Sequence, residues 1–371
     1  MLRQRGSPTL HYLDRYCGIP AIAVLASLRR KRKLPPTIES IGLLRLGGIG
    51  DTVLVSAAVA DLRRAFPRVP LTFFSGPTNL EFVQMMDGLD RVVEVSVRNI
   101  AGGIRAIRSV PVDVMIDFGP WPRLEALYTL LSRASFTIGF QTPGQYRHYG
   151  YDLTVHHSPT VHELENFRQL VRPLGVKTVS LPSLRRPRIG TLLDSPYVVF
   201  HLWPGGRRKE LKQWPSERWV KLIEEFVARG MKVALTGAHS DSGCNDAIIG
   251  CLQPCARRFV RNVAGVSLPE TAAMLAHSCL VVSVNTGVMH MAAALNVRLV
   301  ALHGPTSSLR WGPIGERAIT VNSPLEGCGY LDLGSEYPTR PPACMECISY
   351  EAVRDACCSS IGMEVESGQV M

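Results

Sequence analysis

The sequence lacks an apolar run long enough to cross a bilayer as a helix, which takes about 20 residues. Near the N-terminus, residues 17–28 (CGIPAIAVLASL) are apolar for only about twelve residues and are followed directly by the basic cluster 29–33 (RRKRK). A signal peptide would carry its basic residues mainly before the apolar core, and no clear small-residue cleavage site follows this one. We therefore expect neither a membrane span nor a signal peptide in this stretch.

Two interpretations of residues 1–36 remain open. An interfacial helix would insert apolar side chains into the headgroup boundary while the basic cluster pairs with anionic lipid. An ordinary core helix followed by a solvated run of charge would have the same pattern. The net charge of +10 and a pI near 9.2 favour an acidic partner, which could be nucleic acid, anionic lipid or a phosphorylated small molecule.

The ten cysteines lack the short, even spacing of a secreted disulfide scaffold. Reduced thiols in a cytoplasmic protein are the simplest interpretation. The pair Cys344 and Cys347 has the spacing of a zinc knuckle, but a second tight pair at a matching distance is missing. A zinc site built from Cys328, Cys344, Cys347 and Cys357 is the alternative.

A complete dinucleotide fingerprint is also lacking. Residues 45–52 (RLGGIGDT) form a glycine-rich turn between an apolar run and a helix-like window, but Val53 occupies the third glycine position of G-x-G-x-x-G. The second half of the chain has no complete fingerprint either, which disfavours a nicotinamide-dependent oxidoreductase. Asp51 stands where that helix should begin, at a place where such turns usually receive phosphate.

Short β-branched or aromatic runs alternate with amphipathic windows, which is typical of βαβ units around a parallel sheet. The expected strands are 41–46, 70–76, 91–97, 112–119 and 135–140 in the first half, and 197–203, 231–237, 280–287 and 297–304 in the second. The expected organisation is an N-terminal segment 1–36, a domain 37–177, a proline- and arginine-rich linker 178–196, a second domain 197–322 and a tail 323–371 that packs back on the fold. Ligands prefer a cleft between two such halves, at the carboxyl ends of strands.

Three strand ends in the second half carry groups suited to a nucleotide diphosphate. After the run 280–284, Asn285, Thr286 and Gly287 begin a helix whose free N–H groups form an anion site, and His290 lies in its first turn. Alternatively, Asn285 or Thr286 only caps this helix.

The other two strand ends offer cations and a carboxylate. A loop beginning at Gly205 carries several basic residues, including Lys212, and fits phosphate binding, although it could equally be a solvated basic loop. Asp241 follows the run 231–237 and could accept hydrogen bonds from ribose hydroxyls, or could cap a helix.

These motifs resemble the ADP-heptose:lipopolysaccharide heptosyltransferases, which form glycosyltransferase family 9. The resemblance spans about residues 41–313 and rests on ordered segments that begin LLRLGGIGDT, HLWPGG, VALTGAHSD and NVAGVSLPETAAM, the last running on through VNTGVMHMAAAL to WGP. It implies an α/β fold of the GT-B class, with two Rossmann-like domains facing across a cleft. It also implies an inverting, metal-independent glycosyl transfer without a cofactor, in which ADP-heptose is a substrate.

The resemblance also implies roles for individual residues. Asp51 would be the general base, with Gly48 and Gly50 in its loop, and Lys212 would neutralise the diphosphate. Asp241 would contact the ribose, and Thr286, Gly287 and His290 would hold phosphate. Many family members have Asp where this chain has Asn285, so a contact that needs a carboxylate there is in doubt.

The resemblance implies a nucleotide-sugar donor and an acidic glycolipid acceptor such as the lipopolysaccharide core. Together with the basic N-terminal segment, it predicts a cytoplasmic protein at the inner face of the cytoplasmic membrane, and no nucleic-acid partner. Two alternatives stay open: a degenerate member that binds a sugar nucleotide without turnover, and a transferase for a different nucleotide sugar.

Overall fold

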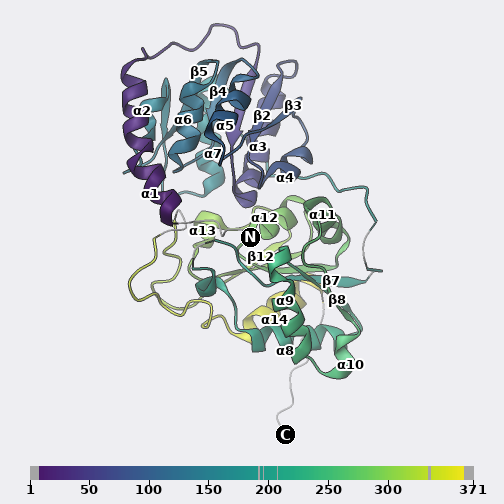
Figure 1. The fold of residues 1–371 in the computed structure, drawn as a ribbon. Helices are drawn as coiled ribbons and strands as arrows, with labels where there is room; N and C mark the ends of the chain where they lie inside the picture. The colour runs from purple at the N-terminus through teal and green to yellow at the C-terminus, as the bar shows by residue number, and fades with distance from the viewer. Residues whose placement is uncertain (1–7, 191–192, 195, 207, 333–335, 363–371) are drawn as a thin grey trace. The chain divides into compact units, whose positions relative to one another are not determined.

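The computed structural model describes residues 8–190, 193–194, 196–206, 208–332 and 336–362. Position 207 of the basic loop, parts of the expected linker, and the outer ends of the N-terminal segment and the tail lie outside these ranges. The chain divides into two compact units, Met1–Leu184 and Arg185–Met371. Each unit has a parallel sheet of its own, with helices packed around it (Figure 1).

The sheet of the first unit has six parallel strands in the order β3-β2-β1-β4-β5-β6. The strands are β1 (Ile41–Arg45), β2 (Leu71–Ser75), β3 (Arg91–Glu94), β4 (Val112–Asp117), β5 (Ala134–Gln141) and β6 (Leu153–His156). Strand β1 pairs with β2 on one side and with β4 on the other. Every residue of β1 is buried, which explains its nearly continuous apolar sequence.

Helices pack on this first sheet and on one another. They are α1 (Pro8–Tyr16), α2 (Gly18–Ser27), α3 (Ile49–Ala65), α4 (Leu80–Gln84), α5 (Ile100–Arg108), α6 (Arg123–Leu131) and α7 (Glu163–Val171), with 3₁₀ turns η1 (Arg147–Gly150) and η2 (Arg172–Leu174). Helix α3 packs against α7, whereas α6 packs against α2 and α5. No described helix has both the length and the apolar character needed to cross a membrane.

The second unit repeats the same architecture, with strand order β12-β11-β10-β7-β8-β9. Its strands are β7 (Tyr197–His201), β8 (Lys232–Thr236), β9 (Val260–Asn262), β10 (Leu280–Val284), β11 (Leu299–His303) and β12 (Ala318–Asn322). Its helices are η3 (Lys209–Lys212), α8 (Ser216–Ala228), η4 (His239–Asp241), α9 (Ser242–Cys251), α10 (Pro254–Arg257), α11 (Leu268–His277), α12 (Gly287–Ala294), α13 (Ser308–Trp311) and α14 (Tyr350–Ile361).

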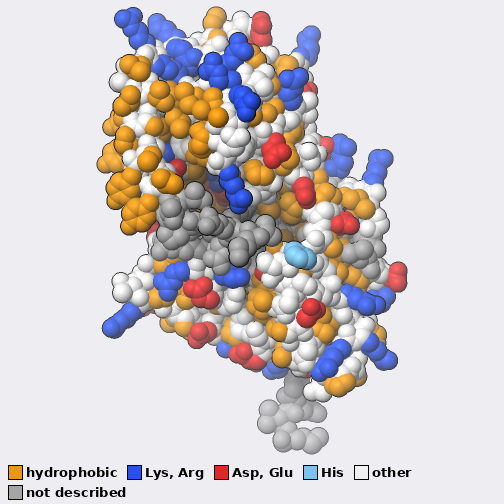
Figure 2. Space-filling view, in the orientation of Figure 1, with side chains coloured by type: hydrophobic (Ala, Val, Ile, Leu, Met, Phe, Trp, Pro, Cys, Tyr) orange, Lys and Arg blue, Asp and Glu red, His pale blue; other side chains and the backbone are white. Residues whose placement is uncertain are grey.

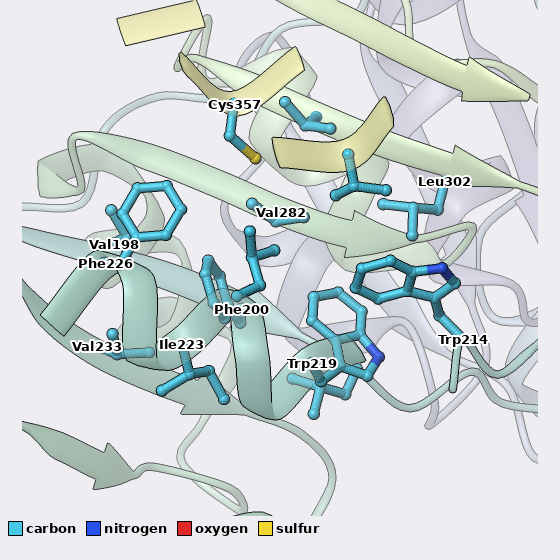
Figure 3. Packing of buried hydrophobic residues seen from close by; sticks show 14 of the residues in the cluster. Val198, Phe200, Trp214, Trp219, Ile223, Phe226, Val233, Val282, Leu302 and Cys357 are labelled. Atoms are coloured by element: carbon cyan, nitrogen blue, oxygen red, sulfur yellow. The ribbon is translucent and has the colours of Figure 1, made fainter. Parts of the chain in front are cut away.

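A large apolar cluster fills the second unit between its sheet and helices α8 and α14 (Figure 3). Trp214 and Trp219 meet edge to face, with ring centroids 4.9 Å apart. The indole N–H of Trp214 donates to the carbonyl oxygen of Ile348, 2.8 Å away, just before α14 begins. Cys357 on α14 is buried in the same cluster. Residues near the C-terminus therefore complete the core of this unit.

Each run expected to be a strand contains one, but three further strands were not expected. These are β6, β9 and β12, and all three lie at sheet edges. Strands β6 and β12 are only partly buried, and β9 has three residues. Because an edge strand covers less of the core, it needs no continuous apolar run, so the sequence signal is weak.

The expectation that all cysteines are reduced is wrong for two of them. Cys328 and Cys344 form a disulfide, with Cα atoms 5.8 Å apart, a separation that suits such a bond. Within the described residues, no group of three or more His, Cys, Asp or Glu side chains is arranged to hold a metal ion. Two members of the alternative zinc set are thus bonded to each other, and Cys357 is buried in the core.

Candidate active site

The glycine-rich turn between β1 and α3 brings Asp51 to the first turn of α3. Gly48 has a φ of 76°, in the left-handed region that favours glycine. A Cβ atom at position 48 would collide with the Asp51 carboxylate. Gly50 is the second residue of the helix. Glycine at position 48 is therefore needed both for the backbone conformation and for the close approach of the Asp51 side chain.

Asp51 is paired with Arg45, the last residue of β1. The guanidinium of Arg45 also contacts Glu125 on α6 at 3.3 Å, and the other oxygen of Glu125 accepts from the backbone N–H of Leu46 at 2.8 Å. The Asp51 side chain is 20% exposed, whereas those of Arg45 and Glu125 are 7% and 2% exposed. The Asp51 carboxylate thus reaches the surface, whereas the other two members of this ionic cluster, Arg45 and Glu125, are buried.

The surroundings shift the pKa values of the two buried members of this chain. Burial by itself lowers the pKa of the Arg45 guanidinium, but the carboxylates of Asp51 and Glu125 outweigh burial and leave that pKa above its ordinary value. Burial raises the pKa of Glu125, and the nearby Asp117 carboxylate adds to this effect while Arg45 opposes it. Arg45 is therefore a fixed cation beside Asp51.

A second buried ionic cluster lies beside the first. Arg147 contacts Asp117, the last residue of β4, at 2.6 Å, and both side chains are fully buried. The hydroxyl of Tyr151 donates to the same carboxylate at 2.5 Å. Strands β1 and β4 are neighbours at the point where the strand order reverses, so both clusters lie at the switch point where such folds bind ligands.

In the second unit, the corresponding reversal lies between β7 and β10. After β7, the ammonium of Lys212 donates to the carbonyl oxygen of Gly205 at 2.7 Å. Partial burial lowers the pKa of Lys212, with Glu210 opposing the shift. The basic loop is thereby folded back on itself, and its Lys212 cation is held near the carboxyl end of β7.

Helix α12 begins immediately after β10 at the same edge of the sheet. Thr286 is its N-cap and accepts from the backbone N–H of Met289 at 3.5 Å. Gly287 is the first helical residue, and His290 follows in the first turn with a side chain only 5% exposed. The cap that the sequence allowed as an alternative is present, and the N–H groups and helix dipole still favour an anion at this end.

The amide of Asn285 has a structural partner at the end of β10. Its Nδ2 donates to the carbonyl oxygen of Trp311 at 3.1 Å, which joins β10 to α13. A carboxylate at this position could not donate that hydrogen bond and would face the carbonyl oxygen instead. The choice of Asn over Asp therefore follows from a local contact of this chain.

Asp241 follows β8, the neighbour of β7. One of its oxygens accepts from the backbone N–H of Ala238 at 2.9 Å, in the turn η4 before α9. This is the local capping role that the sequence left open.

At the end of β7, buried His201 contacts the hydroxyl of Thr236 on β8 at 3.0 Å, and burial lowers the pKa of His201 to about 4.

The candidate residues fall into two groups. Gly205, Lys212, Asp241, Asn285, Thr286, Gly287 and His290 lie at the carboxyl ends of three adjacent strands of one sheet. Gly48, Gly50 and Asp51 belong to the first unit. Sequence reasoning missed Arg45 as the partner of Asp51 and Glu125 as the second partner of Arg45. A charged residue that ends the apolar run IGLLR was the available signal for Arg45, whereas nothing local pointed to Glu125.

Residues 126–330, just over half of the chain, match the family model described as glycosyltransferase family 9 (heptosyltransferase). Lipooligosaccharide heptosyltransferase 2 of Haemophilus influenzae is 36% identical over 135 residues, which is 36% of this chain and 38% of the relative. Lipopolysaccharide heptosyltransferase 1 of Salmonella typhimurium is 24% identical over 80% of this chain and 98% of its own. The matches to the first of the curated relatives thus span less than two-fifths of their length.

Solved structures of similar proteins share the fold. The Escherichia coli ADP-heptose lps heptosyltransferase II superposes with a TM-score of 0.72, at 18% identity, over 87% of this chain and 98% of its own. The E. coli heptosyltransferase WaaC with ADP gives a TM-score of 0.69 at 19% identity, over 86% and 99%. The expected α/β fold of the GT-B class is therefore confirmed for the two Rossmann-like units. With the family model covering more than half of its length, the chain belongs to glycosyltransferase family 9, the heptosyltransferase family.

Proposed function

We propose that this protein transfers heptose from ADP-heptose to a lipopolysaccharide core or a related acidic glycolipid, with inversion and without a metal ion. The observation that carries the proposal is the partly exposed Asp51 carboxylate, held at the start of α3 by Arg45. The similar proteins are lipooligosaccharide and lipopolysaccharide heptosyltransferases, which supports the donor sugar and the acceptor class.

Asp51 is the general base in this proposal. The acceptor hydroxyl oxygen attacks the anomeric carbon as its proton passes to the Asp51 carboxylate, and the bond from that carbon to the diphosphate oxygen breaks. Attack opposite the leaving group inverts the anomeric configuration. The second oxygen of Asp51 accepts no hydrogen bond from any described residue, which leaves it available to the acceptor.

The departing ADP needs positive charge and N–H donors instead of a metal ion. Lys212 at the end of β7 supplies a cation, and the N-terminus of α12 supplies backbone N–H groups, with His290 in its first turn. Asp241 is the proposed ribose contact, through the carboxylate oxygen that Ala238 does not use. Gly205 leaves room for the diphosphate beside Lys212.

The proposed place of work is the inner face of the cytoplasmic membrane, where a basic protein meets anionic lipid and a glycolipid acceptor. The net charge of +10 supports this. Nucleic acid is not a proposed partner.

A transfer assay tests this function. Purified protein is incubated with each of a panel of sugar nucleotides and with a heptose-deficient lipopolysaccharide core acceptor, in the presence of a chelator. The expected result is a product of one added heptose from ADP-heptose alone, with the anomeric configuration inverted in the NMR spectrum. Donor binding without any product would favour the degenerate protein, and product from another nucleotide sugar would reassign the donor. Loss of activity with the chelator would overturn metal independence.

A further inference from the structure

Partly buried ionic contacts hold the helices α1 and α2 against the first unit. Asp14 on α1 pairs with Arg123 at 3.0 Å. Just after α2, Arg29 and Arg32 pair with Asp152 at 2.6 and 2.9 Å, and the Asp152 side chain is 2% exposed. Ile22 is fully buried against α6. These contacts fix which face of the two helices points inward.

The opposite face of the same helices is apolar and exposed. Five large apolar side chains lie on it, with exposed fractions from 54% to 81%: Tyr12, Leu13, Tyr16, Val24 and Leu28. On α1, Tyr12 and Leu13 precede Tyr16 by four and three residues. On α2, Val24 precedes Leu28, the C-cap of that helix, by four, so each set lies on one side of its own helix. Tyr12 stacks on Tyr16 with centroids 5.5 Å apart. Figure 2 shows the hydrophobic side chains gathered over α1 and α2. We call this set of five residues the apolar face.

The basic residues 29–33 that follow α2 fall into two groups, one paired within the fold and one exposed. Arg29 and Arg32 are used inside the fold, where they neutralise Asp152. Arg30, Lys31 and Lys33 are exposed, and no acidic side chain of the described residues pairs with them. Three cations therefore remain at the end of the apolar face where α2 stops.

A cavity of about 390 Å³ lies between this end of α2 and the η1 segment. Arg30 and Lys31 line it, and Ala26 and Leu130 supply apolar walls. Asp152 also lines it, but its carboxylate is neutralised by Arg29 and Arg32. Lys31 is close enough to lower the pKa of His148, although burial of that imidazole contributes more. A cavity with apolar walls and two exposed cations in its lining fits a phosphate that remains attached to an acyl-bearing glycerol.

We infer that the apolar face and this cavity together are a docking site for anionic phospholipid at a bilayer surface. The apolar side chains enter the headgroup boundary, while Arg30 and Lys31 bind the phosphate of one lipid and Lys33 adds attraction to the anionic surface. A free anion would leave the apolar face unused. A second copy of the chain would bring the same positive charge rather than a complementary one.

This inference adds a lipid-binding site to the membrane location given in the proposed function. It rests on the proposed function for the kind of membrane that is bound. It does not rest on glycosyl transfer, because lipid binding is measured without donor or acceptor.

The test is sedimentation of the full chain with vesicles of phosphatidylcholine, with and without phosphatidylglycerol. Wild type should bind only the anionic vesicles. Arg30→Gln with Lys31→Gln should weaken binding by about 30-fold, since each basic residue near an anionic surface contributes about 1 kcal/mol. Val24→Ser with Leu28→Ser should weaken it by about tenfold or more, through lost apolar burial.

Matched controls separate position from composition. Arg186→Gln with Arg188→Gln removes the same charge from exposed residues of the second unit, and Val179→Ser with Leu181→Ser makes the same apolar change at sites about half exposed. Both controls should bind like wild type. Unchanged thermal unfolding shows that all four variants are folded.

Three results would overturn the inference. Equal binding of neutral and anionic vesicles would remove the role of the cations. If the test and control variants lost vesicle binding equally, net charge or mean apolarity alone would explain the loss. A dimer that Val24→Ser with Leu28→Ser dissociates, without vesicle binding by wild type, would assign the apolar face to a second copy. A variant of the lipid site that loses lipid binding but keeps transfer activity on a water-soluble acceptor would separate this site from the proposed function.

Discussion

Asn285 makes a structural contact that the sequence did not predict. Its Nδ2 donates to the carbonyl oxygen of Trp311 from the end of β10. The same position begins the segment proposed to hold the donor diphosphate, so the contact with Trp311 also orients the start of α12. The degenerate protein stays an alternative that the transfer assay decides.

Asn285→Asp should therefore lower the free energy of unfolding by about 1 kcal/mol, because a partly buried hydrogen bond is lost and an acceptor is placed against another acceptor. Urea unfolding at neutral pH measures the change. Asn322→Asp is the matched control, since Asn322 is exposed at the end of β12, and it should change stability by less than about 0.5 kcal/mol. Equal stability of the two variants would mean that the Trp311 contact contributes nothing.

At the level of secondary-structure elements, the pairing of β7 with β8 includes a contact made by a buried side chain that can titrate. His201 on β7 is 7% exposed and meets Thr236 on β8. Because burial lowers the pKa of His201 from 6.5 to about 4, the imidazole is neutral in the folded protein at neutral pH. Protonation of the His201 imidazole therefore requires the centre of the second sheet to open, next to the loop that carries Lys212.

This contact predicts a pH dependence with a definite sign. Between about pH 6.5 and 4 the unfolded chain binds a proton that the folded chain does not, so stability falls as the pH falls through that window. The full contribution is about 3 kcal/mol, at about 1.4 kcal/mol for each pH unit. His201→Asn should flatten the stability profile in this window, measured by urea unfolding at a series of pH values.

The exposed His156 provides the comparison. His156→Asn should leave the wild-type slope unchanged. A His201→Asn profile as steep as that of wild type would assign the acid sensitivity to other groups.

For the whole molecule, the sequence predicted the central strands well because their apolar runs are long and buried on both faces. It missed β6, β9 and β12, since edge strands carry little of that pattern. Asp51 was noticeable from its place after a glycine-rich turn, and its role as the base was implied only by the resemblance to the heptosyltransferases. Its buried support was not noticeable, because Arg45 and Glu125 are 80 residues apart and meet only in the folded unit.

Two further features depended on tertiary contacts in the same way. Residues 29–33 look uniform in the sequence, and only the position of Asp152 divides them into structural and exposed cations. The disulfide between Cys328 and Cys344 joins residues 16 positions apart whose Cα atoms lie 5.8 Å from each other in the fold, which no spacing rule indicated. How the two units face one another across the expected cleft stays a prediction.

The proposed heptose transfer depends on Asp51 acting as the general base. The most direct measurement compares wild type with Asp51→Asn in the rate of heptose transfer from ADP-heptose, while ADP binding is followed by calorimetry. Asn keeps the size of the side chain and a hydrogen-bonding oxygen but cannot take up the acceptor proton. We predict a rate lower by about 10² to 10⁴, the usual contribution of a general base, with unchanged ADP affinity. Equal transfer rates in the two proteins would contradict the account.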